Sequence, residues 1–171
     1  GEFVWPETVP ILPANCFNGS AISSFVAKTG LKEIRQQVFQ SCANLKTVVL
    51  PDTLETMNQQ SWAVSVTDLT VYWRTCPKNA LSGGLYVDWG SGRNRMHYLS
   101  ATPENIAAWQ AWESSSYVND GTNYKEFHLP ALKANGAPDY SAVGTCGQEG
   151  GKLYWWKDPD LQPKALTIIV R

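Results

Sequence analysis

The sequence has few of the groups from which catalytic and metal-binding sites are built. It contains only 2 histidines and 4 cysteines, and charged residues make up 17% of its 171 residues. No Cys-x-x-Cys pair and no Gly-x-Ser-x-Gly motif occurs, so neither a zinc site nor a serine nucleophile has a recognisable framework. We therefore expect no catalytic residue, no metal site and no cofactor.

The sequence also lacks an excess of charge of one sign. Its 14 basic residues are balanced by 15 acidic ones, which leaves no basic surplus of the kind that binds nucleic acid. No apolar stretch reaches the roughly 18 residues that a membrane-spanning helix needs. We expect neither a nucleic-acid partner nor a transmembrane segment.

What the sequence does contain is an internal repeat. Its units begin at Val9, Leu31 and Leu54, which are 22 and then 23 residues apart. In each unit a second apolar residue follows three positions later, and an aromatic residue follows eight positions after the first. The predicted core columns of the repeat are Val9, Leu31 and Leu54, then Leu12, Ile34 and Met57, and then Phe17, Phe39 and Trp62.

Each unit is followed by a short apolar run that predicts a strand. In the second unit this run is Leu45, Val48 and Leu50, and Pro51 ends it because proline cannot donate to a β-ladder. One such circuit cannot bury its own apolar side, whereas stacked circuits share a continuous core. The repeat therefore predicts a solenoid with the aromatic residues above one another.

The second unit resembles the BspA-like class of leucine-rich repeat, which is common in bacterial surface proteins. Residues 34–54 follow the consensus of that class, Ala-Phe-x-x-Cys-x-x-Leu-x-x-Val-x-Leu-Pro, almost column by column. The resemblance extends over residues 4–113. It implies an α/β fold: a short right-handed leucine-rich-repeat solenoid of about three coils, with parallel strands.

Residues 97–112 resemble the element that closes such arrays. Thr102 before Pro103 is a good helix N-cap with proline at the first helical position. Ile106, Trp109 and Trp112 can form one apolar face of the helix that follows. Because the end of a solenoid needs a cover, we expect this helix to cap the core.

We recognise no family in residues 114–171, and we expect them to form a β-rich extension of unknown type. Lys152–Trp156 and Ala165–Val170 are predicted strands. The predicted organisation is thus a capped solenoid over residues 4–113 and the extension after it.

The cysteines fit this organisation as thiols. Cys16 and Cys42 are predicted to lie in the core, in different columns of the repeat, where a thiol behaves as a small apolar group. The sequence leaves open whether Cys76 and Cys146 form a disulfide.

The resemblance implies a non-enzymatic binding or adhesion module that acts by protein–protein interaction. Its location would be extracytoplasmic, either at the bacterial cell surface, where it could be lipid-anchored, or in the secreted fraction. The ligand is an unknown protein or glycan. Candidate contact residues are the exposed strand residues Lys46, Thr47 and Val49.

Two alternative functions remain. The first is carbohydrate binding, because 8 tryptophans are many for this length and aromatic faces stack on sugars. Trp155 and Trp156 are adjacent, so in a strand they face opposite sides and one of them can be exposed. The second is an enzyme of unknown class, for which Cys146 and His128 are the only thiol–imidazole pair worth weighing.

Overall fold

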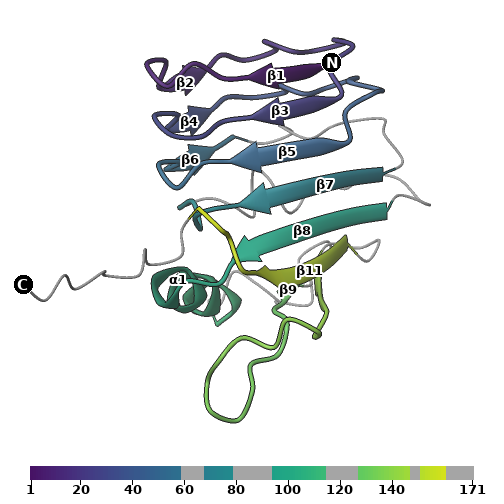
Figure 1. Ribbon diagram of the computed structural model, residues 1–171. Helices are drawn as coiled ribbons and strands as arrows, with labels where there is room; N and C mark the ends of the chain where they lie inside the picture. Colours follow the sequence, from purple (N-terminus) through teal and green to yellow (C-terminus); the bar gives the residue numbers. More distant parts are fainter. Residues whose placement is uncertain (59–67, 79–93, 115–126, 147–150, 161–171) are drawn as a thin grey trace, which may run out of the picture.

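The computed structural model describes residues 1–58, 68–78, 94–114, 127–146 and 151–160. Over this part the chain winds into a solenoid whose successive coils are stacked on one another (Figure 1). Two sheets line opposite sides of the solenoid, and the side with the larger sheet is here called the longer side. Its strands include β1 (Glu2–Val4), β3 (Ser24–Val26), β5 (Thr47–Leu50), β7 (Asp68–Trp73) and β8 (Asn94–Ser100). The strands on the shorter side are β2 (Ile11–Leu12), β4 (Glu33–Ile34) and β6 (Thr56–Met57).

The longer side forms one eight-stranded sheet in the order β1-β3-β5-β7-β8-β11-β10-β9. All pairings from β1 to β11 (Gly151–Trp156) are parallel, whereas β10 (Gly144–Cys146) is antiparallel to both β11 and β9 (Phe127–His128). The shorter side forms a parallel sheet in the order β2-β4-β6. The predicted fold class is confirmed: a solenoid of about three turns with parallel strands.

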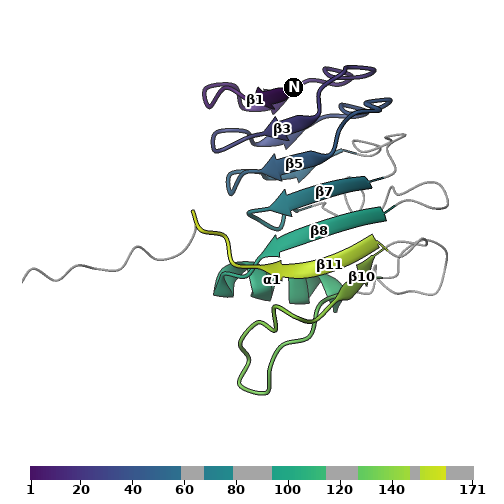
Figure 2. The same cartoon turned by 45° about the vertical axis from the view of Figure 1, so that its right-hand side comes forward.

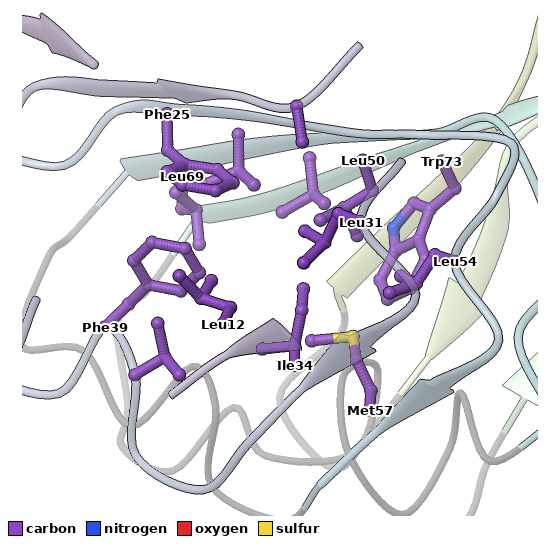
Figure 3. Packing of buried hydrophobic residues seen from close by; sticks show 14 of the residues in the cluster. Leu12, Phe25, Leu31, Ile34, Phe39, Leu50, Leu54, Met57, Leu69 and Trp73 are labelled. Atoms are coloured by element: carbon purple, nitrogen blue, oxygen red, sulfur yellow. The ribbon is translucent and has the colours of Figure 1, made fainter. Parts of the chain in front are cut away.

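The core lies between the two sheets. In Figure 3 the side chains of Leu12, Ile34 and Met57 from the shorter side point toward those of the longer side. The core is continuous because each coil contributes an apolar residue at the equivalent position. The fully buried members include Leu12, Phe25, Leu31, Ile34, Phe39, Leu45, Val48, Leu50, Met57, Val71 and Trp73.

The aromatic column stacks as the repeat predicts. The rings of Phe17 and Phe39 are parallel within 5°, with centroids 5.9 Å apart. Phe25 packs edge-on against both of them and joins the longer side to this column. The third predicted member, Trp62, lies outside the described residues.

Two residues predicted for the core are exposed instead. Val9 is 36% exposed, because its coil has a neighbouring coil on one side only, whereas its repeat partners Leu31 and Leu54 lie deeper in the stack and are buried. Cys16 is also exposed. Cys42 is buried as predicted, and its thiol donates to the carbonyl oxygen of Phe17 at 2.8 Å.

The backbone conformation at the corners also repeats from coil to coil. Asn15 (φ 60°) and Gln37 (φ 56°) occupy the same corner of successive coils, and Gly19 (φ 70°) and Ser41 (φ 58°) occupy the next. A positive φ is tolerated well by glycine and poorly by most other residues. The coil geometry therefore imposes this conformation on Gln37 and Ser41, whose residue types do not favour it.

The helix α1 (Pro103–Glu113) covers the core beyond the short strands (Figures 1 and 2). The Thr102 side chain accepts a hydrogen bond from the backbone N–H of Asn105, so the predicted N-cap is confirmed. Trp109 is buried and packs edge-on against Trp73, with ring centroids 6.0 Å apart. Ile106 and Trp112 pack against the same core, so the predicted apolar face of the helix is confirmed.

Residues after the helix continue the sheet of the solenoid. The predicted strand at 152–156 is confirmed as β11, which pairs in parallel with β8. The predicted strand at 165–170 lies outside the described residues. Between β9 and β10 the chain forms a loop that projects beyond the sheet (Figure 2). Where one domain ends and the other begins, placed at residues 113 and 114 from the sequence, stays a prediction.

Candidate functional site

The face of the eight-stranded sheet that points away from the core, here called the outer face, carries a continuous apolar row. The register of the strands brings one residue from each of six neighbouring strands into line. The members of this apolar row are Val4, Val26, Val49, Tyr72, Tyr98 and Tyr154. Val4 is 49% exposed and the other five are half-buried, as outward side chains of a sheet are.

The three tyrosines of the apolar row, here called the tyrosine ladder, are stacked ring on ring. The ring centroids of Tyr72 and Tyr98 are 5.0 Å apart at 17°, and those of Tyr98 and Tyr154 are 5.1 Å apart at 20°. Loss of water and the two neighbouring phenols raise the pKa of Tyr98 above its ordinary value. The rings of Tyr72 and Tyr154 thus cover the two faces of the Tyr98 ring.

Trp156 extends the aromatic surface along the strand direction. Its ring centroid lies 4.9 Å from that of Tyr72, although β8 separates their strands. The residue of β8 in register with Trp156 is Ser100, whose small side chain leaves space for the indole to cross. The Arg74 guanidinium carbon lies 5.9 Å from the centre of the Trp156 ring, within the range of a cation–π contact.

Arg74 is fixed in turn by two carboxylates that follow β11. Its Nε donates to Oδ2 of Asp158 at 2.9 Å, and a second guanidinium nitrogen donates to Asp160. The backbone N–H of Asp160 donates to Oδ1 of Asp158, which orders the turn. The Asp158 side chain is fully buried, so the ion pair is shielded from water. The pair ties the segment after β11 to the end of β7.

A second outward row runs beside the apolar row, two residues earlier in each strand. Its members, here called the polar row, are Glu2, Ser24, Thr47, Thr70, Met96 and Lys152. The residues at its two ends, Glu2 and Lys152, are exposed and carry opposite charges. The outer face thus combines an apolar stripe with a hydroxyl-bearing border that is acidic at one end and basic at the other.

The structure places two of the three residues predicted from the second coil on this face. Thr47 belongs to the polar row and Val49 to the apolar row, and both are half-buried. Lys46 precedes β5 and is exposed, with its Nζ 4.0 Å from a carboxylate oxygen of Asp68. Their role as contacts for a ligand stays a prediction.

The two adjacent tryptophans face opposite sides of β11, as predicted. Trp155 points into the core, is 3% exposed, and donates its indole N–H to the carbonyl oxygen of Pro130 at 2.9 Å. Its surface is not accessible to a ligand, which corrects its place among the candidate binding residues. Trp156 is half-buried on the outer face and remains a candidate.

The possible thiol–imidazole pair does not come together. Cys146 and His128 lie on the paired strands β10 and β9, but Cys146 is buried whereas His128 is exposed. All four cysteines lie in the described part of the chain, and no two of them form a disulfide. Burial raises the pKa of the Cys76 thiol to about 12, which keeps it protonated. Within the described ranges no three His, Cys, Asp or Glu side chains cluster so as to hold a metal ion.

Sequence reasoning missed the tyrosine ladder. Its three members occupy equivalent places in similar strand segments, in which the tyrosine stands between two buried residues: Val71-Tyr72-Trp73, His97-Tyr98-Leu99 and Leu153-Tyr154-Trp155. This shared pattern was available in the sequence. The spacing of the three tyrosines, however, departs from the repeat of 22–23 residues, so the repeat alone does not align them.

The stacked coils, the parallel ladders and the single core define a leucine-rich-repeat solenoid. The family model described as "BspA type Leucine rich repeat region (6 copies)" matches residues 2–72. Those residues are therefore a BspA-type leucine-rich repeat region, and the predicted resemblance is confirmed there. The likeness of residues 73–113 to the end of such an array stays a prediction. Neither the curated proteins nor the solved structures yield a match to this chain. Among the described residues no helix is long and apolar enough to cross a bilayer.

Proposed function

We propose that this chain is a non-enzymatic binding module that recognises a protein partner through the outer face. The observation that carries the proposal is the tyrosine ladder, which is half-buried on the outer face and continuous with three valines. Tyrosine is enriched at protein interfaces because one rigid side chain offers apolar contact and a hydroxyl. An extracytoplasmic location accords with the BspA-type repeat.

The geometry of the rings favours protein over carbohydrate as the ligand. A sugar packs flat against an open aromatic face, but both faces of Tyr98 are covered by its neighbours. Trp156 contacts Tyr72 and Arg74, so its ring is also engaged. Ring edges and hydroxyl groups suit the mixed apolar and polar contacts of a protein surface better than sugar stacking.

The proposal can be tested by screening the folded chain against a phage-displayed random-peptide library and, in parallel, a glycan array. We expect the library to yield peptides whose affinity falls about tenfold or more with Tyr98→Ser, since truncating a central interface aromatic costs about 2 kcal/mol. Tyr140→Ser is the matched control, because Tyr140 is 48% exposed and lies in the loop between β9 and β10. Its replacement should leave the affinity unchanged.

Two results would contradict the proposal. One is a set of selected peptides that bind Tyr98→Ser and the native chain equally well. The other is specific glycan binding that is lost on Trp156→Ala and retained on Tyr98→Ser. The second result would establish the carbohydrate alternative in its place.

A further inference from the structure

The apolar row is asymmetric in a regular way. Its first three members, on β1, β3 and β5, are valines, and its last three, on β7, β8 and β11, are tyrosines. We propose that the outer face binds a second copy of this chain, face to face, about a twofold axis that runs parallel to the strands. This inference rests on the proposed function in that both use the same face.

Such an axis sets each row of one copy against the same row of the other in reverse order. Val4 then meets Tyr154 of the second copy, Val26 meets Tyr98, and Val49 meets Tyr72. Every opposed pair combines one small and one large side chain, so the two sheets keep an even separation along the whole row, as packed sheets require. A twofold axis perpendicular to the strands would instead set tyrosine against tyrosine and valine against valine.

The charges of the polar row obey the same symmetry. Glu2 of one copy lies opposite Lys152 of the other, and symmetry generates this pair at both ends of the interface. Between the ends Ser24 faces Met96, and Thr47 faces Thr70. No like charges of the polar row are opposed, so the face is complementary to itself, which is what an isologous dimer needs.

The area of the outer face determines how strongly we expect two copies to associate. Six strands about 4.8 Å apart span roughly 24 Å. The apolar row, the polar row and the outward position of Ser100 and Trp156 span, with their side chains, roughly 20 Å along the strands. About 500 Å² per copy, or about 1,000 Å² in total, is at the low end for specific interfaces. We therefore expect a reversible dimer whose dissociation constant is micromolar or weaker.

Charge exchange tests the proposed pairing directly. In sedimentation velocity over a concentration series, Glu2→Lys or Lys152→Glu should each weaken self-association about tenfold or more, because each sets like charges against each other twice per dimer. The double variant should restore it. A mixture of the two single variants should also associate, because only the mixed dimer then has opposite charges at both ends.

A matched control uses an exposed ion pair outside the outer face. Lys32 lies 3.3 Å from Glu55, and both side chains are more than half exposed. Made singly, Glu55→Lys and Lys32→Glu repeat the charge changes of Glu2→Lys and Lys152→Glu, and each should leave the dissociation constant unchanged. Circular dichroism verifies that each variant keeps the fold.

Exchange of size gives an independent test of the reversed order. Val26→Tyr sets tyrosine against the Tyr98 of the second copy and should weaken association. Adding Tyr98→Val to the same chain restores one small and one large residue in each pair, so it should recover the native dissociation constant within about threefold.

The inference is overturned if the chain stays monomeric up to millimolar concentration, or if it dimerises with no response to either exchange. The first result leaves the proposed function standing wherever selected peptides still depend on Tyr98. If the mixture of Glu2→Lys and Lys152→Glu associates and the peptide library yields no binder, the second copy is the ligand of the outer face.

Discussion

At the scale of single residues, the tyrosine ladder makes one phenol depend on its neighbours. Burial and the two adjacent phenols raise the pKa of Tyr98. Replacing Tyr72 by Phe removes one source of negative charge at high pH, so we expect the pKa of Tyr98 to fall toward its ordinary value. Absorbance titration at 295 nm of the native chain, Tyr72→Phe and Tyr98→Phe measures the shift. Tyr140→Phe serves as the control. If the pKa of Tyr98 is the same in the native chain and in Tyr72→Phe, the result contradicts the stacking.

A second residue-scale prediction concerns the corner at Ser41. Ser41 adopts φ 58° at the corner where the preceding coil has Gly19 at φ 70°. A left-handed conformation costs a non-glycine residue roughly 1 kcal/mol. Ser41→Gly should therefore raise the free energy of unfolding by up to about 1 kcal/mol, measured by urea denaturation. The reciprocal change, Gly19→Ser, should lower it by a similar amount, and opposite signs would show that the corner is not strained.

Residue-level reasoning predicted the inward columns because the repeat places them at equal spacing. It erred at Val9 and Cys16, since equal spacing does not reveal which coil has neighbours on both sides. It could not choose between Trp155 and Trp156 either. Alternation shows that they face opposite sides, but only the pairing of β11 with β8 determines which side is the core.

At the scale of secondary structure, helix α1 depends on its N-cap residue, Thr102. The Thr102 hydroxyl accepts from the Asn105 backbone N–H at 3.3 Å. Thr102→Ala should lower the free energy of unfolding by about 1 kcal/mol, and Thr102→Ser should retain most of it. Thermal or urea unfolding measures both. Equal losses for the two variants would mean that the hydroxyl is not what stabilises the helix end.

The helix and the strands of the repeat were predictable, whereas the position of β11 was not. The helix carries local signals, namely a capping threonine, a proline and spaced tryptophans. The parallel pairing of β11 with β8 joins segments more than fifty residues apart, and no periodicity connects them. The tyrosine ladder depends on that pairing, which is why the candidate site could be only partly predicted.

At the scale of the whole molecule, the ion pair of Arg74 with Asp158 joins the repeat to the C-terminal strands. Asp158 is fully buried at its side chain, so removing its cationic partner leaves a shielded charge. Arg74→Met should lower the free energy of unfolding by about 3 kcal/mol. Lys32→Met, in the exposed pair with Glu55, should cost less than about 1 kcal/mol. Similar losses in urea denaturation would show that the Arg74 pair is no stronger than a surface contact.

The close approach of Tyr72 to Trp156 has an optical consequence. Ring centroids about 5 Å apart permit efficient transfer of excitation from tyrosine to tryptophan, and the tyrosine ladder ends beside an indole. Light absorbed along the tyrosine ladder should therefore reach Trp156, with Trp73 and Trp155, which follow Tyr72 and Tyr154 in the sequence, as competing acceptors. The part of the tryptophan emission that Trp156→Phe removes comes from the outer face, and it should change when a partner comes to lie against that face.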